Sequence, residues 1–284
     1  MDLAMAAPRT IFVLSGGGSR GAGQVGMLRA LWEAGITPDV LVGGSVGAIN
    51  ACFVGAHPTA DGVEELAAHW LGMSESALCG GRRDAVLNLA RRRPYLYSSD
   101  RLRTLARSWV PTYHLENLPL PVVVATTDLA TGRAVHHDHG YVPDLLAASA
   151  ALPGLFPPVA LEGPDGVVTH VDAGIAENVP LSAALTLAGP GDRVVVLDVT
   201  RVPQTSRALR NPLDVIIASL VAAVRNREEP AFAPGVEIIR CKLDESYDCG
   251  GVFDFGHTPT LFRLGEEAAD AAIAAMRPTR PLAA

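Results

Sequence analysis

The sequence predicts an α/β protein in which a mainly parallel central sheet is flanked by helices. The main observation is the order of the first segments, which read strand, loop, helix, strand, turn, helix, as in parallel sheets covered by helices. A composition of 49% hydrophobic and 19% charged residues is that of a globular protein. The 284-residue chain shows no internal repeat and no low-complexity linker, so we expect one domain over residues 1–284.

Two strand–helix units open the chain. A short buried strand is expected at Thr10–Leu14, followed by a glycine loop and a helix over residues 22–36, whose apolar residues recur at helical spacing. Gly35 lies where a helix commonly ends on glycine. A second strand over residues 38–43 and a second helix over residues 46–55 follow. The two strands are expected to be neighbours in the sheet.

The rest of the chain is predicted to complete the sheet and its helices. Residues from about 57 to 100 contain helical fragments without strand alternation, so we expect a helical insert or cap there. The other predicted elements are a strand pair at 121–138, a short helix from 142 that ends at Pro153-Gly154 and leads into a proline-rich loop, strands at 165–171, 192–199 and 236–241, and helices at 211–229 and 258–276.

Charge and cysteine content narrow the class of protein. The net charge of −7 argues against a nucleic-acid partner. The four cysteines show no CxxC spacing, which disfavours a metal site or a disulfide framework and fits a reducing compartment. No signal peptide is expected, and the most apolar helix-like run, residues 215–224, is about half the length that spans a bilayer. We therefore expect a cytoplasmic protein that is at most peripheral at a membrane.

The stretch VLVGGSVGAIN places one serine at a tight strand-to-helix joint. Ser45 has Gly43 two residues before it and Gly47 two residues after it, and Gly44 and Val46 complete the turn. A nucleophile elbow needs small residues at these two positions, because the serine has a positive φ in a very sharp turn. The sequence therefore favours a nucleophile at Ser45. The alternative is an ordinary loop between a strand and a helix.

A second candidate site is the loop after the first strand, formed by Gly16, Gly17, Gly18, Ser19, Arg20 and Gly21. Its pattern also matches the G-x-G-x-x-G of dinucleotide-binding proteins, which requires an acidic residue at the end of the next strand. That strand ends at Ser45 and has Asp39 at its beginning, so the nucleotide interpretation fails. Backbone N–H groups at the start of a helix suit an oxyanion hole equally well. A plain glycine turn is the alternative.

Asp172 is the third candidate. It lies at the carboxyl end of a predicted strand, where α/β sheets place their active sites, and Ala173 and Gly174 follow it in a turn. Taken alone, Asp172 is as readily a turn or helix-cap residue. Asp128 and Asp198 also end strand-like runs, and for them we favour the structural interpretation.

The histidines offer two further possibilities. A Ser-His-Asp hydrolase needs a histidine late in the chain, for which His257 is the candidate, but only one strand precedes Ser45, unlike in the α/β-hydrolases. The run His136-His137-Asp138-His139 suggests a metal cluster. Because alternate residues of a strand face opposite ways, we favour a solvated hairpin end instead.

Arginines gather between residues 82 and 93, at Arg82-Arg83 and Arg91-Arg92-Arg93. A solvated helix face is the simpler interpretation of this group. The alternative is attraction to anionic lipid head groups, which high salt would weaken.

Four motifs in this order resemble those of the patatin-like phospholipases. They are the glycine loop at 16–21, the elbow at 43–47, the block at 148–153 with Phe156-Pro157-Pro158, and Asp172-Ala173-Gly174 with Asn178-Val179-Pro180. Each motif is weak alone, but the four in order are specific. The resemblance covers at least residues 10–200 and implies a three-layer sandwich. One departure is Ala173, where the family often has glycine.

The resemblance implies a carboxylic ester hydrolase that acts on lipids through a Ser-Asp dyad without histidine. Ser45 would be the nucleophile and Asp172 the base, and the reaction would pass through an acyl-enzyme. The oxyanion hole would be formed by the N–H groups of Gly17, Gly18, Ser19 and Val46. An exposed aspartate is too weak a base for a hydroxyl, so Asp172 is expected to be buried and within hydrogen-bond reach of Ser45.

The resemblance also indicates which cofactors and binding partners to expect. No metal or other cofactor is expected, and the implied partners are a lipid or other ester substrate and a transient contact with a membrane surface. Two rival interpretations stay open. One is a conventional Ser-His-Asp esterase that uses His257, and the other is a non-catalytic lipid-binding or regulatory module.

Overall fold

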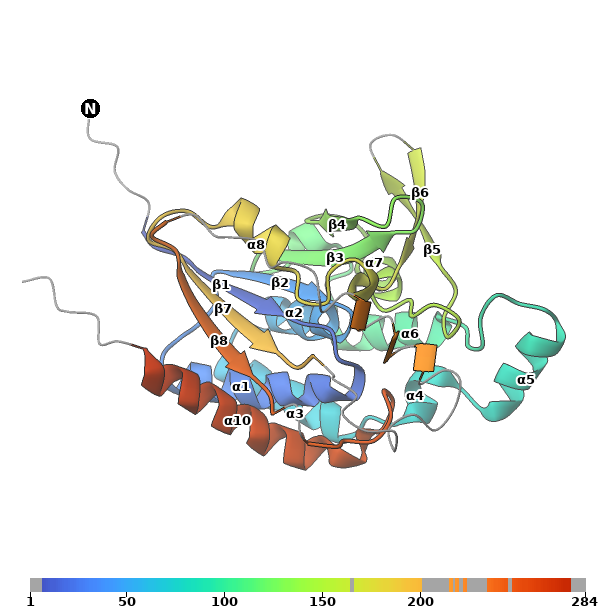
Figure 1. The fold of residues 1–284 in the computed structure, drawn as a ribbon, viewed down its shortest axis with the longest axis horizontal. Helices are drawn as coiled ribbons and strands as arrows, with labels where there is room; N and C mark the ends of the chain where they lie inside the picture. Colours follow the sequence, from blue (N-terminus) through green and yellow to red (C-terminus); the bar gives the residue numbers. More distant parts are fainter. Residues whose placement is uncertain are drawn as a thin grey trace, which may run out of the picture.

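The computed structural model describes residues 7–163, 166–200, 215–216, 218–219, 222–223, 234–244 and 247–276 of the chain. A single sheet of eight strands forms the centre of this part of the molecule (Figure 1). The strands are β1 (Thr10–Leu14), β2 (Val40–Gly44), β3 (Val122–Asp128), β4 (Ala134–His137), β5 (Val159–Gly163), β6 (Gly166–Val171), β7 (Arg193–Asp198) and β8 (Glu237–Lys242).

Most of the sheet is parallel. The strand order is β5-β6-β3-β2-β1-β7-β8, and β3, β2, β1, β7 and β8 run in the same direction. The central strands β1, β2 and β7 are runs of buried, mainly apolar residues, as expected for strands covered on both faces. β1 and β2 are neighbours, as predicted, so the loops that follow them open at the same edge.

The other edge of the sheet is antiparallel. β4 and β6 both pair with β3, and β5 forms a hairpin with β6. β5 was not predicted, because this five-residue strand directly follows the proline-rich loop and mixes apolar and charged residues. The hairpin matters for the site because β6 leads directly to Asp172.

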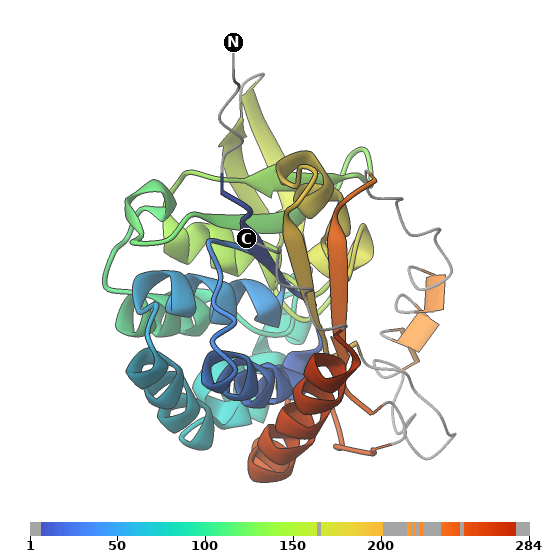
Figure 2. The same ribbon diagram turned by 90° about the vertical axis from the view of Figure 1, so that its left-hand side faces the viewer.

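Helices cover both faces of the sheet, which confirms the predicted fold class. One face carries α1 (Ala22–Glu33), α2 (Val46–Ala56), α3 (Ala60–Leu71), α6 (Asp100–Trp109), α7 (Val142–Ser149) and α10 (Thr258–Ala275). Their apolar sides form the larger core with the sheet, and α1 and α10 lie side by side (Figure 2). The opposite face packs against α8 (Leu181–Leu187).

Several helical boundaries differ from the sequence-based expectation. α8 was not predicted, because its seven residues are too few to show a helical period. α7 ends at Ser149 rather than at Pro153-Gly154. The region from 57 to 100 forms α3 and two short helices, α4 (Glu75–Cys79) and α5 (Arg82–Ala90), and helical structure continues to Trp109 in α6.

The helix expected at residues 211–229 lies largely outside the described residues. Within the described part of the chain, no helix combines the length and the apolar character needed to cross a bilayer.

Candidate active site

Ser45 lies at the sharp corner between β2 and α2, as its sequence context predicts. Its φ of 54° and ψ of −126° fall in a region that residues with a side chain rarely adopt. A Cβ on Gly43 would collide with the carbonyl of Gly47, and a Cβ on Gly47 would collide with the carbonyl of Leu14. Glycine at both positions therefore lets the corner pack against β1 while Ser45 is held in a strained conformation.

Asp172 lies beside Ser45, although the two residues are 127 positions apart in the chain. Its Oδ2 accepts a hydrogen bond from Ser45 Oγ at 2.8 Å, and its Oδ1 accepts one from the Gly174 N–H at 2.8 Å. Asp172 is 2% exposed and Ser45 is 9% exposed. The expectation of a buried carboxylate within reach of the serine is therefore met.

Burial sets the basicity of Asp172. Desolvation raises the pKa of its carboxyl, the hydrogen bonds from Gly174 and Ser45 partly lower it again, and the resulting pKa is about 6. The carboxylate is then the main form at neutral pH and a stronger base than an exposed aspartate. A hydroxyl that is hydrogen-bonded to such a group is poised to lose its proton to it.

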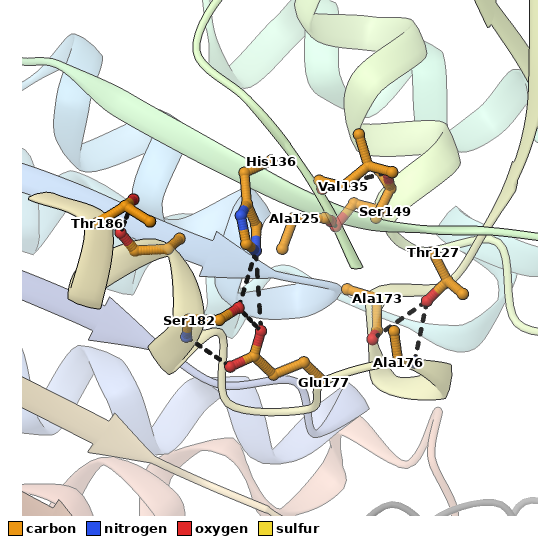
Figure 3. Close-up of polar contacts among 12 residues, drawn as sticks. Ala125, Thr127, Val135, His136, Ser149, Ala173, Ala176, Glu177, Ser182 and Thr186 are labelled. Carbon is orange, nitrogen blue, oxygen red and sulfur yellow. Dashed lines mark hydrogen bonds and ion pairs between the residues drawn. The ribbon is translucent and has the colours of Figure 1, made fainter. Parts of the chain in front are cut away.

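The backbone of Ser45 is held by a second buried serine. The Ser45 N–H donates to Ser149 Oγ at 2.8 Å, and Ser149 Oγ donates to the Ala125 carbonyl at 2.7 Å. Ser149 is fully buried at the end of α7, and Figure 3 shows its bond to Ala125. The sequence placed Ser149 in a motif but gave no sign that its hydroxyl bridges β3 and the strained corner.

The backbone of Asp172 is likewise held by a hydrogen bond, from a side chain on β3. Thr127 Oγ1 donates to the Asp172 carbonyl at 2.8 Å and accepts from the Ala176 N–H at 3.0 Å. Figure 3 shows Thr127 reaching the turn that follows Asp172, where Ala173 lies. Thr127 was not predicted as a site residue, since a threonine in a strand gives no distinguishing sequence signal.

The glycine loop lies against the corner. The Gly16 N–H donates to the Asn178 carbonyl at 2.8 Å, which ties the loop to the segment after Asp172. The Ser19 N–H donates to the Val252 carbonyl at 2.7 Å. The expectation that the Ser19 N–H is free for an oxyanion hole is therefore wrong, because a residue from the far end of the chain occupies it.

Three other N–H groups at the corner are available. Among the described residues, the N–H groups of Gly17, Gly18 and Val46 have no hydrogen-bond partner. Gly18 and Val46 also line the same cavity as Ser45. Unpaired N–H groups close to a candidate nucleophile are the kind of donor that an oxyanion hole uses.

Arg20 anchors the glycine loop to the C-terminal part of the chain. Its buried guanidinium donates to the carbonyls of Val199 at 3.2 Å, Tyr247 at 3.2 Å and Asp244 at 2.8 Å. These bonds fix the segment before Val252, which in turn binds the loop. The role of Arg20 here is thus to hold two loops together.

A buried polar network joins α1, α2 and α3 behind the corner. Asn50 Nδ2 donates to Gln24 Oε1 at 2.8 Å and to the Gly21 carbonyl at 3.1 Å, and Trp70 Nε1 donates to Asn50 Oδ1 at 2.9 Å. Gln24 Nε2 donates in turn to the Ser15 carbonyl at 2.9 Å. The network fixes the indole of Trp70, and sequence reasoning missed all three side chains.

An apolar cavity lies next to Ser45. Its walls come from α2, α3, α6, the loop after α7 and the segment before α10, and include Trp70, Leu105, Trp109, Phe156, Phe253 and Phe255. Such a lining favours a hydrocarbon chain over a charged ligand.

His257 does not join Ser45 and Asp172. Its Nδ1 shares a hydrogen bond with the Tyr247 hydroxyl at 2.8 Å. In the part of the chain that the structure describes, which holds every histidine, no imidazole hydrogen-bonds to Ser45 or Asp172. A Ser-His-Asp triad is therefore not assembled.

The histidine run on β4 divides between two faces, as strand geometry predicts. His136 Nε2 lies 3.2 Å from Ser182 Oγ and 3.8 Å from Glu177 Oε2 (Figure 3). His137 Nε2 lies 2.8 Å from Thr126 Oγ1. No group of three or more His, Cys, Asp or Glu side chains in the described residues is arranged to hold a metal ion.

Asp128 and Asp198 have the structural roles that were favoured for them. Asp128 accepts from the Ala130 N–H and from Thr131 Oγ1, each at 2.8 Å, and so closes the turn between β3 and β4. Asp198 accepts from the Thr200 N–H at 2.9 Å, just after β7.

Comparison with known proteins finds longer relatives. The chain is 29% identical over 184 residues to patatin-like phospholipase domain-containing protein 7 of Rattus norvegicus, covering 65% of this chain and 13% of that protein. It is 27% identical over 277 residues to lysophospholipase nte1 of Aspergillus terreus, covering 89% and 17%. It is 27% identical over 175 residues to an uncharacterised NTE family protein of Mycobacterium bovis, covering 62% and 45%. The chain thus spans less than half the length of each relative.

A family model described as patatin-like phospholipase matches residues 12–185. The matched span is more than half of the chain and runs from β1 into α8. It includes the glycine loop, the corner at Ser45 and the carboxylate of Asp172. The chain belongs to the patatin-like phospholipase family.

Proposed function

We propose that this chain is a serine acyl hydrolase that cleaves carboxylic esters of lipids through a Ser45–Asp172 dyad. The observation that carries the proposal is the 2.8 Å hydrogen bond from Ser45 Oγ to the buried Asp172. Membership of the patatin-like phospholipase family and a relative named as a lysophospholipase support a lipid ester as the substrate.

In the acylation half of the reaction, Ser45 Oγ bonds to the ester carbonyl carbon while Asp172 accepts the hydroxyl proton. The carbonyl oxygen becomes an oxyanion, which the free N–H groups of Gly17, Gly18 and Val46 stabilise. Loss of one such donor lowers kcat by about 10²–10³ in measured cases. The intermediate then collapses, the proton passes from Asp172 to the leaving alcohol, and the acyl group stays on Ser45 Oγ.

In the deacylation half, water attacks the acyl carbon and Asp172 accepts its proton. The bond to Ser45 Oγ then breaks, the proton passes from Asp172 to that oxygen, and the fatty acid leaves. One carboxylate thus acts as base and acid in both halves. Its pKa of about 6 makes this exchange feasible near neutral pH without a histidine.

The apolar cavity supports an acyl chain as the group held during the reaction. Leu105, Trp109 and Phe156 line it, and Ser45 lies at its wall. Transfer of hydrocarbon from water to apolar surroundings contributes about 0.8 kcal/mol per CH₂. Affinity should therefore rise with acyl length until the cavity is filled.

The test is a hydrolysis panel with the Ser45→Ala protein as blank. The panel contains p-nitrophenyl esters of increasing chain length, a lysophospholipid, a phospholipid and a triacylglycerol. We expect turnover above the blank, with KM falling as the acyl chain lengthens. If no ester is hydrolysed faster than by Ser45→Ala, the proposal fails and a non-catalytic lipid-binding module becomes the better account.

A further inference from the structure

We propose that residues 82–93, here called the docking finger, seat this protein on anionic lipid bilayers and bring the mouth of the cavity to the membrane. The docking finger consists of α5 and the arginine run that follows it. The purpose of such a device rests on the lipid hydrolysis proposed above. The membrane contact itself is inferred from the exposure, the charge and the position of residues 82–93, none of which depends on the lipid hydrolysis.

The docking finger presents aliphatic side chains to solvent. Val86 is 65% exposed, Leu87 is 49% exposed and Leu89 is 67% exposed. All three belong to a helix of nine residues, and none joins a hydrophobic cluster of the described residues. Figure 1 shows α5 standing away from the body of the molecule. These exposed side chains within one short helix are available to a second surface.

Positive charge flanks these side chains in the sequence. Arg83, Arg91, Arg92 and Arg93 are exposed, and none forms a salt bridge in the described part of the chain. Asp84 is the only acidic residue between positions 82 and 93, although the chain as a whole carries a net charge of −7. A cationic patch on an acidic protein fits an anionic surface, and each arginine near such a leaflet strengthens binding about fivefold.

Both ends of the docking finger lead to segments that contribute to the cavity wall. Before it, α4 supplies Leu78 to the cavity wall. After it, the Leu96 N–H donates to the Gly154 carbonyl at 3.0 Å, two residues before Phe156, which also lines the cavity. Figure 1 shows α5 on the side toward which the parallel strands point, and β2 is one of these strands and ends directly before Ser45. A bilayer that binds the finger is therefore close to segments that form the cavity wall.

A lipid surface satisfies both features of the docking finger at once. The aliphatic side chains can enter the boundary of the acyl region, while the long arginine side chains keep their charges at the phosphates. A protein partner fits less well. Three aliphatic side chains offer less than the roughly 800 Å² that each partner of a standard interface buries.

The test measures co-sedimentation with phosphatidylcholine vesicles that contain or lack phosphatidylglycerol. It uses the Ser45→Ala background, so that the lipid stays intact. The first variant carries Arg91→Gln, Arg92→Gln and Arg93→Gln, and we expect it to bind anionic vesicles about a hundredfold more weakly. The second carries Val86→Ser, Leu87→Ser and Leu89→Ser, and we expect a loss of at least about tenfold.

Matched controls come from exposed positions elsewhere. Val167→Ser removes an apolar side chain that is 70% exposed on β6, and Arg263→Gln removes an exposed arginine on α10. Both should bind as the parent does. In a second readout, Leu87→Trp fluorescence should be quenched by brominated lipids, whereas Val167→Trp fluorescence should not.

The readouts separate the docking finger from the proposed chemistry. With Ser45 restored, both finger variants should hydrolyse a soluble short-chain ester at the parental rate and vesicle lipid more slowly. Parental vesicle binding by both variants, equal binding to neutral and anionic vesicles, or no binding at all would overturn the docking proposal while leaving the dyad intact. Absence of soluble-ester hydrolysis would instead count against the dyad, and the sedimentation result would still decide the finger.

Discussion

The corner at Ser45 is buried, whereas the docking finger is exposed to solvent. At the corner, Ser45, Ser149 and Asp172 are buried, and their side-chain oxygens and the Ser45 N–H all have hydrogen-bond partners. In the finger, Val86 and Leu89 remain exposed, although they are apolar. Burial at the corner raises the pKa of the Asp172 carboxyl and so makes the carboxylate a stronger base. In the finger, apolar side chains stay in contact with water.

This difference teaches how one chain can combine chemistry with surface attachment. On the proposed mechanism, the buried and hydrogen-bonded pair of Ser45 and Asp172 acts on any ester that reaches it. An exposed helix outside the core affects only where the protein goes. Substitutions of Ser45 or Asp172 should therefore abolish or strongly lower turnover of every substrate, while substitutions in the finger should lower only the turnover of lipid presented as a surface.

The largest effect expected is on turnover of a soluble ester. Asp172→Asn removes the proposed base and should lower kcat by at least about 10⁴-fold, the loss measured when only the aspartate that orients a histidine base is replaced, while His257→Ala should keep kcat near the parental value. Thermal unfolding of both variants checks that they fold. Activity of Asp172→Asn within tenfold of the parent, or loss of activity in His257→Ala, would restore the Ser-His-Asp interpretation.

The next effect is on stability. The pKa of Asp172 is about 6 in the folded chain against 3.8 for the unperturbed group. Below pH 3.8 the carboxyl is protonated in both the folded and the unfolded chain, and its burial carries no ionisation penalty. As the pH rises through 6, burial of the ionised carboxylate makes the folded chain less stable. Asp172→Asn removes this loss and should raise the free energy of unfolding at pH 8 by about 3 kcal/mol, with a much smaller gain at pH 4.

Urea unfolding at the two pH values measures this effect. The Val86→Ser, Leu87→Ser, Leu89→Ser variant is the comparison from the finger, and it should change the free energy of unfolding by no more than about 0.5 kcal/mol at either pH. An equal gain for Asp172→Asn at pH 4 and pH 8 would contradict a buried carboxylate of raised pKa.

The pH dependence of catalysis follows from the same group. Because Asp172 must be ionised to accept a proton, kcat/KM for a soluble ester should fall about tenfold for each pH unit below about 6. Variants of the finger should show the same profile. A profile that is flat down to pH 5 would show that another group acts as the base.

The smallest effect expected is at the support of the corner. Ser149→Ala leaves the Ser45 N–H and the Ala125 carbonyl without their partner, which costs about 1–3 kcal/mol. The strained corner should relax, so that kcat falls about tenfold or somewhat more while KM stays the same. Ser182→Ala is the control, because its hydroxyl bonds to Glu177 rather than to the corner. A change in KM alone would assign Ser149 to substrate binding.

The sequence predicted those parts of the site that depend on local backbone. The corner at Ser45 needs glycines at fixed spacing, and Asp172 follows a strand that ends at the same edge of the sheet. The parallel strands could also be predicted from local sequence, because the central ones are continuous runs of mainly apolar residues. Short elements such as β5 and α8 carry too few residues for a periodic signal.

The rest depends on which remote side chains meet after folding. In the sequence, Ser149 and Asn50 look like ordinary polar residues. In the fold, Ser149 at the end of α7 binds the Ser45 N–H, and Asn50 on α2 binds Gln24 on α1. The Ser19 N–H was misassigned because its partner, Val252, comes from the other end of the chain. The arginines of the finger were visible in the sequence, but the exposure of Leu89 beside them was not.

The most direct measurement is the rate at which a fluorophosphonate phosphonylates the protein with loss of fluoride, with the modified residue located by mass spectrometry. We expect the adduct on Ser45, at equal rates in the parent and in His257→Ala, and at least about a hundredfold more slowly in Asp172→Asn. An adduct at another residue, or labelling of Asp172→Asn at the parental rate, would contradict the central claim that a buried aspartate alone activates this serine.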